Sequence, residues 1–141
     1  IRILEAGLKV LQSVSECILQ PQSDLDKVRQ FLHQHGFQIV QEKMLIDEGK
    51  YYVVMRVLHG EERIYTEAED IYGRFLINEK HPVLKEYLEK QKAVKEKLLL
   101  ALKDKTSEKS HERQQELLHE LQIIIETITR MVDENAEQRP D

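Results

Sequence analysis

The feature that most constrains this sequence is a repeat of apolar side chains at alternating steps of three and four residues. The repeat runs from Leu84 to Ala101 and, after a polar break, from Leu117 to Met131. This spacing puts the apolar residues on one side of a helix and is typical of a coiled-coil seam. We therefore expect two helices that bury these sides against each other.

The two predicted helices carry opposite charges. Residues 80–105 contain eight lysines against four acidic residues, whereas residues 107–135 contain seven acidic residues against three basic ones. Exposed pairs of opposite charge contribute roughly a few tenths of a kcal/mol each. The sequence predicts that residues 81–136 form an antiparallel coiled-coil hairpin within one chain, and that the polar residues 137–141 fray.

Residues 1–60 combine helix and strand patterns and predict an α/β fold. The last two strands are expected to form an antiparallel hairpin whose loop takes a positive φ at Gly49. Ser23 or Asp24 is expected to cap the second helix, and Gly36 to end it. Residues 61–80 are interpreted as a connector that packs its aromatic and aliphatic side chains back on the sheet or on the base of the helices that follow. The predicted ranges are 1–11 and 24–36 for the helices, and 16–19, 37–46 and 51–58 for the strands.

Composition excludes several classes of protein. A single cysteine, Cys17, rules out a disulfide framework, and its apolar surroundings favour a buried, inert thiol. No apolar run approaches the ~20 residues that cross a bilayer, and the N-terminus lacks a signal-peptide pattern. The net charge of −5 argues against indiscriminate nucleic-acid binding by the whole chain. We therefore expect a soluble, cytoplasmic protein with no membrane contact.

No motif in the sequence completes a catalytic or metal site. His33 and His35 are two residues apart on a predicted helix and so point in different directions, and we expect both, with His111 and His119, at the surface. The sequence from His119 begins like a zinc-protease helix, but Ile123 stands where the second histidine is required. The glycines form no phosphate-binding loop. We therefore predict no metal site and name no catalytic residue.

The segment Gln20-Pro21-Gln22 follows the first predicted strand, and two interpretations of it stay open. It can be an ordinary turn before a capped helix, because proline commonly shapes such turns. It can instead bind a ligand, because open α/β sheets hold their ligands at the carboxyl ends of strands. A glutamine side chain offers one acceptor and two donors, which suits it to the edge of a base.

Several stretches of the chain occur in an order that is more specific than any one of them. A strand ending in Leu19-Gln20-Pro21-Gln22 is followed by Val28-Arg29-Gln30-Phe31-Leu32, by Gly36-Phe37-Gln38-Ile39 with Glu42 nearby, by Gly49-Lys50-Tyr51-Tyr52, and by Tyr72-Gly73 and Lys80-His81-Pro82. In this order the chain resembles the bacterial tRNA adenine-22 N1-methyltransferases over nearly its whole length. Gln22 stands where that family usually has Asn, a change that keeps the amide and lengthens the side chain.

The resemblance implies an enzyme that depends on S-adenosylmethionine, with this chain as its C-terminal portion. The chain would supply the C-terminal half of a Rossmann-like methyltransferase sheet with an antiparallel final hairpin, followed by the coiled-coil hairpin. The family's glycine-rich cofactor loop would lie upstream of Ile1, so this segment would hold no cofactor-binding residues and would be inactive alone.

The resemblance also implies site residues. Gln20, Pro21 and Gln22 would lie near the pocket for the target adenine. Phosphates of the tRNA would be held by lysines of the first hairpin helix, although a solvated helix face explains the same residues. These lysines are Lys85, Lys92, Lys95 and Lys97.

Two other functions remain consistent with the residues. A coiled-coil adaptor would use the apolar seam between chains, and its oligomer would dissociate on dilution. A non-catalytic RNA-binding accessory protein would use the same lysines without ever binding the methyl donor. The resemblance ranks methylation of tRNA first, because it extends through both the sheet and the hairpin.

Overall fold

The computed structural model describes Gly7 and residues 16–132. The chain divides into two compact units, 1–79 and 80–141, so the connector belongs to the first unit. The first predicted helix, apart from Gly7, and the predicted frayed tail lie outside the described residues. Within the described part of the chain, no helix is long and apolar enough to span a bilayer.

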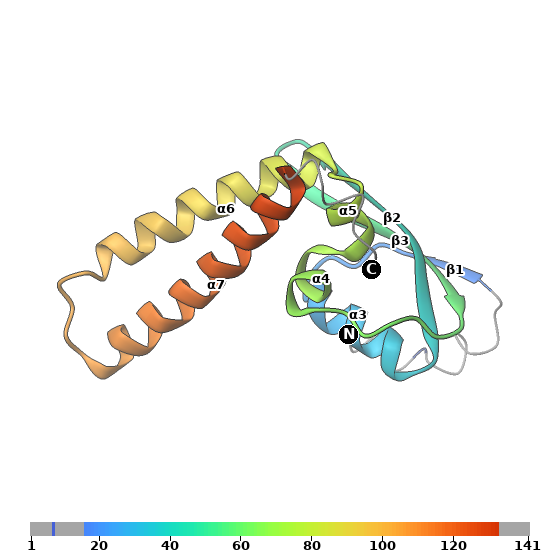
Figure 1. Ribbon diagram of the computed structural model, residues 1–141, viewed down its shortest axis with the longest axis horizontal. Coiled ribbons are helices and arrows are strands. Elements are labelled where there is room, and N and C mark those ends of the chain that lie inside the picture. Colours follow the sequence, from blue (N-terminus) through green and yellow to red (C-terminus); the bar gives the residue numbers. More distant parts are fainter. Residues whose placement is uncertain (1–6, 8–15, 133–141) are drawn as a thin grey trace. The chain divides into compact units, whose positions relative to one another are not determined.

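The first unit is built on a three-stranded sheet (Figure 1). Its strands are β1 (Glu16–Leu19), β2 (Phe37–Asp47) and β3 (Lys50–His59), in the order β1-β3-β2. Because β3 is antiparallel to both neighbours, β1 and β2 run in the same direction. The predicted antiparallel hairpin is confirmed, and its last strand lies between the two strands that helix α3 (Leu25–Gln34) connects.

A two-residue turn joins β2 to β3. Glu48 and Gly49 have φ values of 50° and 78°, which is the combination of a type I′ turn. Such a turn matches the right-handed twist of the strands that it joins. The positive φ that the sequence predicts at Gly49 is confirmed.

Helix α3 covers one face of the sheet with its apolar side (Figure 1). Val28, Phe31 and Leu32 are buried, at the spacing of an amphipathic helix. Burial of such side chains contributes roughly 1.5–3 kcal/mol each. The buried apolar residues of β2 and β3 are Phe37, Ile39, Met44, Val53, Met55 and Val57.

The predicted side-chain cap of α3 is wrong, whereas its predicted end is confirmed. Asp24 precedes the first turn, but its backbone is left-handed (φ 52°, ψ 44°) and its side chain accepts no capping hydrogen bond. A capping side chain usually acts from extended backbone, so this geometry turns the carboxylate away from the free amides. The helix ends at Gln34, and Gly36 follows with a φ of 80°.

The connector contains two short helices, α4 (Glu67–Tyr72) and α5 (Arg74–Asn78). Thr66 and Glu69 begin α4 with a capping box, in which each side chain accepts a hydrogen bond from the backbone amide of the other residue. Helix α5 contacts β2. The buried apolar residues of the connector are Tyr65, Leu76 and Ile77. The prediction that the connector packs back on the sheet is therefore confirmed.

The second unit is a helical hairpin of α6 (Pro82–Ala101) and α7 (Glu108–Val132), in which α7 runs back along α6 (Figure 1). Pro82 occupies the first turn of α6, where its missing amide leaves no hydrogen bond unmade. The ring of His81 accepts a hydrogen bond from the Val83 amide and so caps the helix.

Most residues of the predicted seam are buried on α7, but only some are buried on α6. Leu84 is buried as predicted, but Val94 and Leu98 are 51% and 44% exposed. Lys95 faces α7 instead, where it pairs with Glu120. Steps of three and four residues fit two neighbouring stripes of side chains along α6. In the second half of the helix, the predicted seam follows the stripe that does not face α7. The buried seam residues of α7 are Leu117, Leu121, Ile124 and Met131.

Candidate functional site

The segment Gln20-Pro21-Gln22 leaves the carboxyl end of β1, whose last residue Leu19 pairs with Met55 of β3. Both glutamine side chains are exposed and make no hydrogen bond to any described residue, whereas Pro21 is half-buried. Two amide groups are therefore available to a ligand at this edge of the sheet.

The β2–β3 hairpin extends beyond the end of β1. Past the level of Leu19, its ladder continues through five residue pairs, from Lys43 and Val54 to Asp47 and Lys50. At about 3.3 Å per residue, this overhang reaches roughly 16 Å past β1. The overhanging part of the hairpin therefore lies beside the sheet edge that carries the two glutamines.

Cys17 of β1 carries no reactive thiolate. It is half-buried, and burial together with the neighbouring Glu16 carboxylate raises the pKa of its thiol. A thiol that stays protonated is a poor nucleophile and a poor metal ligand. Glu16 is itself held by a hydrogen bond from Arg56 of β3, which lowers the pKa of the Glu16 carboxyl.

A buried ion pair joins α3 to β2. The Arg29 guanidinium donates through Nε and Nη2 to the two carboxylate oxygens of Glu42, at 3.2 and 2.8 Å, and neither side chain is exposed. Its Nη1 donates to the carbonyl oxygens of Asp70 and Ile71, at 2.7 and 2.8 Å. Burial raises the pKa of Glu42, although Arg29 favours the ionised form. Arg29 thus links the helix, the sheet and the connector.

A bulge in β2 turns Glu42 inward. The pairing with β3 shifts between Ile39 and Gln41, so Val40 is the extra residue. Ile39 is buried before the bulge, and Glu42 and Met44 are buried after it. If the same residues formed a regular strand with no bulge, strict alternation from Ile39 would point Glu42 away from Arg29 of α3.

Neither member of this pair is among the predicted site residues, although signals for both exist in the sequence. Arg29 follows the buried Val28 on the side of α3 that faces the sheet, where a charged residue needs a partner. Both Arg29 and Glu42 stand in the stretches that carry the family resemblance. The bulge that brings them together leaves no local mark in the sequence.

Glu62 forms a second polar cluster at the start of the connector. Its carboxylate accepts hydrogen bonds from the Ile39 amide (3.0 Å) and the Tyr65 hydroxyl (3.2 Å), and it lies 2.5 Å from Nε2 of His33. Burial opposes ionisation of Glu62, but these partners outweigh it and lower the pKa of the carboxyl. His33, which was predicted at the surface, is half-buried, and its ring also packs edge-on against Tyr65.

This cluster does not belong to the candidate ligand site. Ile39 lies near the amino end of β2, whereas Gln20 and Gln22 follow the carboxyl end of β1. Ile39 and Cys17 both pair with Val57 of β3, so the cluster lies beside β2 at the level of Cys17, whereas the two glutamines follow the carboxyl end of β1 at the other edge of the sheet.

Two of the four lysines predicted to hold tRNA phosphates are engaged within the hairpin. The Nζ atom of Lys95 lies 3.0 Å from Oε2 of Glu120, and only 19% of the Lys95 side chain is exposed. Lys92 lies 3.8 Å from Glu96 on the same helix. An exposed pair within one helix, such as Lys92 with Glu96, contributes little to stability and opens readily. The pair of Lys95 with Glu120 instead joins α6 to α7.

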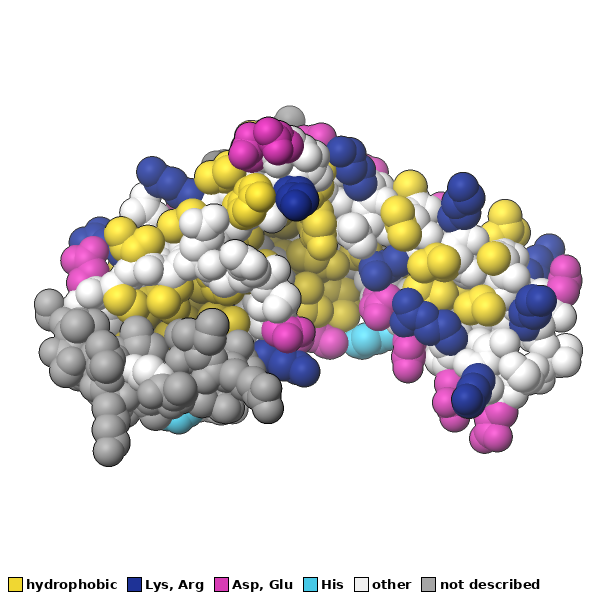
Figure 2. Space-filling model, turned by 180° about the vertical axis from the view of Figure 1, so that it is seen from behind, with side chains coloured by type: hydrophobic (Ala, Val, Ile, Leu, Met, Phe, Trp, Pro, Cys, Tyr) yellow, Lys and Arg dark blue, Asp and Glu magenta, His cyan; other side chains and the backbone are white. Residues whose placement is uncertain are grey.

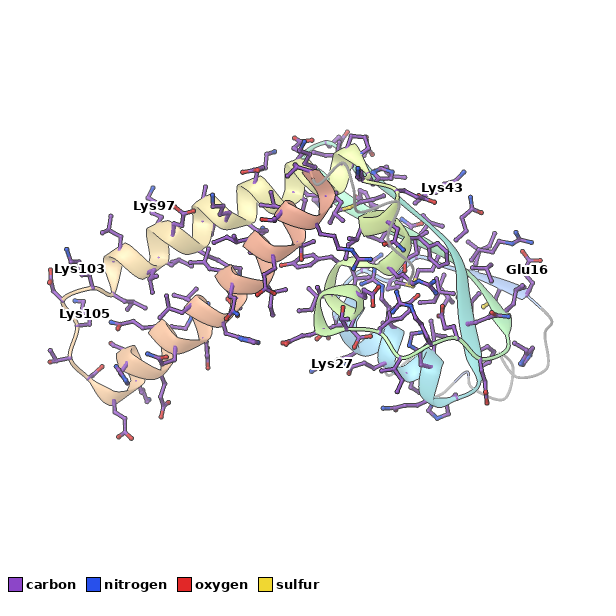
Figure 3. All side chains as sticks on the ribbon, in the orientation of Figure 1. Glu16, Lys27, Lys43, Lys97, Lys103 and Lys105 are labelled. Atoms are coloured by element: carbon purple, nitrogen blue, oxygen red, sulfur yellow. The ribbon has the colours of Figure 1, made fainter. Side chains whose placement is uncertain are left out.

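The other two lysines, Lys85 and Lys97, are exposed and form no ion pair with a residue that the structure describes. Figure 3 shows Lys97 on α6 and Lys103 and Lys105 in the turn after it, with their side chains projecting from the hairpin. Lys103 and Lys105 are exposed and likewise unpaired among the described residues. The available basic groups therefore extend from α6 into the turn.

The described residues offer no cluster of three or more His, Cys, Asp or Glu side chains that could hold a metal ion. On α7, His119 is exposed, whereas Ile123 is buried at the position where a zinc-protease helix needs its second histidine. The two positions therefore do not project toward a shared site.

One protein family matches most of the chain. Its model, described as tRNA (adenine(22)-N(1))-methyltransferase, matches residues 1–126. The chain belongs to this family. A Streptococcus pneumoniae protein described as a tRNA (m1A22) methyltransferase is 37% identical, with a TM-score of 0.73 over 90% of this chain and 55% of its own. The structure of that protein in complex with S-adenosyl-L-methionine matches at 36% identity and a TM-score of 0.71, over 90% of this chain and 53% of its own.

Two further solved structures extend the likeness of the fold. A Streptococcus agalactiae protein of the NADB-Rossmann superfamily is 31% identical, with a TM-score of 0.73 over 90% of this chain and 53% of its own. The B. subtilis m1A22 tRNA methyltransferase TrmK is 24% identical, with a TM-score of 0.79 over 90% of this chain and 57% of its own, which shows the fold alone. This chain spans about half the length of these solved family relatives. No curated protein matches it.

Proposed function

We propose that this chain forms the C-terminal half of an S-adenosylmethionine-dependent enzyme that methylates N1 of adenine 22 in tRNA. The observation that carries the proposal is the family match over residues 1–126. The sheet adds support, because β1 and β2 run in parallel with α3 between them, as in one half of a doubly wound α/β fold. An enzyme of tRNA modification would act in the cytoplasm.

In this proposal, Gln20 and Gln22 hold the target adenine at the carboxyl end of β1. A base inside a stacked RNA cannot reach a methyl donor, so the adenine must be turned out of its stack and held. The amide groups can donate to and accept from the edge of the base, and Pro21 between them restricts the backbone of the segment. Correct placement of N1 supplies much of the rate, because the step then becomes effectively unimolecular.

S-adenosylmethionine supplies the methyl group when it is bound. The described residues contain no glycine-rich loop at a strand end, and the amides of Gln20 and Gln22 are exposed polar groups at the carboxyl end of β1. We therefore assign cofactor binding to the part of the family fold that this chain does not span, and expect the 141-residue segment alone to be inactive.

The hairpin is proposed to bind the tRNA backbone through Lys85 and Lys97, with Lys92 as a weaker contributor. The first two are exposed and unpaired among the described residues, and the pair of Lys92 with Glu96 is solvent-exposed. Each phosphate contact releases a counterion, so binding should weaken steeply with salt. Lys95 is better suited to hold α7 through Glu120 than to contact phosphate.

Methyl transfer by the full-length protein to two tRNAs tests the proposal. One tRNA carries adenine at position 22 and the other carries guanine there, with all other nucleotides identical. We expect transfer from radiolabelled S-adenosylmethionine to the first tRNA only. Equal labelling of both would refute the target site, and labelling of neither would refute the activity. The same assay on residues 1–141 alone should show no transfer.

One observation favours a second function, that of a coiled-coil adaptor. Val94 and Leu98 lie exposed at seam spacing on α6, and Figure 2 shows hydrophobic side chains among basic ones on the surface of the hairpin. A helix from another chain could cover them. Sedimentation over a range of protein concentrations separates the two functions, because an adaptor would dissociate on dilution and an intrachain hairpin would not.

A further inference from the structure

We propose that the overhang of the β2–β3 hairpin, which is the part past the end of β1, binds a nucleotide next to the target adenine. Tyr52 stacks on the base of that nucleotide, and Lys43 contacts its phosphate. The inference rests on the proposed function and deepens it, because it assigns tRNA contacts beside the adenine site. Both residues belong to the first unit.

The register of the sheet places Tyr52 and Lys43 on the face that points away from α3, here called the outer face. Val53 is buried on the inner face, under α3. Because side chains alternate along a strand, Tyr52 lies on the other face. Leu45 pairs with Tyr52 across the ladder, and Lys43 precedes Leu45 by two residues. Residues that lie opposite each other share a face, so all three side chains lie on the outer face.

The outer face of the overhang is accessible to a ligand. Leu45 is 44% exposed, and Lys43 is exposed and forms no ion pair with a described residue. Figure 3 shows the side chain of Lys43 projecting from β2 on the side away from α3. Tyr52 is half-buried, and its hydroxyl group makes no hydrogen bond within the described part of the chain. An aromatic ring, an apolar neighbour and an available cation therefore share one surface.

Tyr52 lies within reach of the neighbours of the adenine. β1 ends at Leu19, which is opposite Met55, and Tyr52 lies three residues further along β3. At about 3.3 Å per residue, this is roughly 10 Å past the end of β1, where Gln20 begins the candidate site. Successive nucleotides of a stacked strand rise about 3.4 Å each. A strand whose adenine lies at the glutamines therefore brings its next nucleotides to the overhang.

The chemistry of this surface suits a nucleotide. When the adenine is turned out of its stack, the bases on either side lose a stacking partner. An aromatic side chain can replace that partner, whatever the base, because every base has a flat π-face. A lysine beside the ring neutralises a phosphate. Asp47 and Lys50 pair at the end of the same face with opposite charges, so Lys43 gives the paired residues of this face a net positive charge.

Four variants of the full-length protein test the inference. Tyr52→Ala removes the ring, and Tyr52→Phe keeps the ring without the hydroxyl group. Lys43→Met removes the charge. Ile18→Ala is the matched control, because Ile18 is 69% exposed on the same face but lies within β1, before the overhang begins. If Tyr52→Ala does not fold, Tyr52→Leu carries the test, since it keeps an apolar side chain beside Leu45 without a flat ring.

Each variant is assayed for tRNA binding, methyl-donor binding and methyl transfer. Three tRNAs are compared: the intact molecule, and two in which the nucleotide just before or just after adenine 22 lacks its base. We expect Tyr52→Ala to bind intact tRNA roughly 5–150-fold more weakly, which is the effect of one lost base stack, and Tyr52→Leu to show a smaller loss. Donor binding and kcat at saturating tRNA should not change.

The tRNAs that lack a base identify the contact. With the base that Tyr52 contacts removed, the wild type and Tyr52→Ala should bind equally, so the effect of the substitution disappears for one of these two tRNAs. Tyr52→Phe and Ile18→Ala should bind intact tRNA as the wild type does. Lys43→Met should lower the slope of log affinity against log salt concentration by about 1.

The opposite results would overturn the inference. Unchanged tRNA affinity for Tyr52→Ala would show that the overhang does not contact the tRNA. An equal loss for Tyr52→Phe would assign the effect to the hydroxyl group, and a loss that persists with both altered tRNAs would place the contact elsewhere. An unchanged salt slope for Lys43→Met would refute the phosphate contact. A wild-type protein that methylates no tRNA would instead refute the proposed function itself.

Discussion

Removal of Arg29 alone should destabilise the first unit more than removal of both members of the Arg29–Glu42 pair. A single substitution to methionine leaves an unpaired charge in a site with no exposed surface, and breaking such a pair costs roughly 3–5 kcal/mol. Arg29→Met should lie at the upper end of this range. It also removes the two hydrogen bonds to the carbonyls of Asp70 and Ile71, each of which contributes about 1 kcal/mol or more.

Glu42→Met should lie at the lower end, near 3 kcal/mol, because Arg29 keeps its two carbonyl acceptors. The double variant replaces the pair with two apolar side chains of similar length, an exchange that is often close to neutral. It still loses the two carbonyl hydrogen bonds, so we expect a cost of about 2–3 kcal/mol. The double variant should therefore be more stable than Arg29→Met alone.

Urea unfolding of the four proteins measures the cycle, with fluorescence and circular dichroism followed together to check that the transition is two-state. The free energies of unfolding give the coupling between the two residues directly. If the cost of the double variant equalled the sum of the single costs, the two side chains would be energetically independent, and the view of a coupled buried pair would be wrong.

Three further predictions concern other residues. Glu62→Gln should destabilise the protein at pH 7 by an amount that shrinks as the pH falls below about 4.5. The lowered pKa of Glu62 contributes stability that is present above the unfolded value of 4.5 and is lost as the native carboxyl takes up its proton; urea midpoints that differ equally at pH 7 and pH 3.5 would contradict this. Gly49→Ala should cost about 1–2 kcal/mol in the same assay because its φ is 78°, and an unchanged midpoint would argue against the type I′ turn. Lys97→Glu should weaken tRNA binding and lower the slope of log affinity against log salt concentration by about 1, without changing stability. Lys95→Glu should instead destabilise the hairpin by placing an acid beside Glu120. A stability loss for Lys97→Glu and a binding loss for Lys95→Glu would show that the two residues have each other's roles.

The elements of the fold could be predicted because each has a local signal. Apolar stretches on either side of a short glycine-containing loop predicted β2 and β3, and helical spacing predicted α3 and α7. Gly49 marked the tight turn and Pro82 the first turn of α6 through conformational restrictions that act within a few residues. These signals depend on a residue and its near neighbours, so the sequence carries them completely.

The features that could not be predicted depend on contacts between distant segments. The insertion of β3 between β1 and β2 is a choice of strand order, which no local pattern encodes. The bulge at Val40 changes which residues of β2 face inward. Its effect is to place Glu42 beside Arg29 of α3, a residue that is distant in the sequence. On α6, two apolar stripes share the same spacing, and only the position of α7 selects between them.

For the candidate site too, local patterns predicted some features, whereas others depend on contacts between distant segments. The place of Gln20 and Gln22 at a strand end followed from the strand pattern, but their assignment to adenine rests on the family. Among the hairpin lysines, charge alone could not separate Lys95, which is engaged by Glu120, from Lys97, which is exposed. That distinction depends on which side of α6 meets α7.

The hydrogen bond from the Ile39 amide to Glu62 also has a consequence for the behaviour of the protein at high concentration. β2 is an outer strand of the described sheet, and outer strands offer unpaired amides on which a strand from a second molecule can add. The Glu62 carboxylate occupies one of these donors and places a negative charge where the incoming strand would lie. The first part of β2 is thereby closed to further strand pairing, which protects the native protein from growing edge to edge into aggregates.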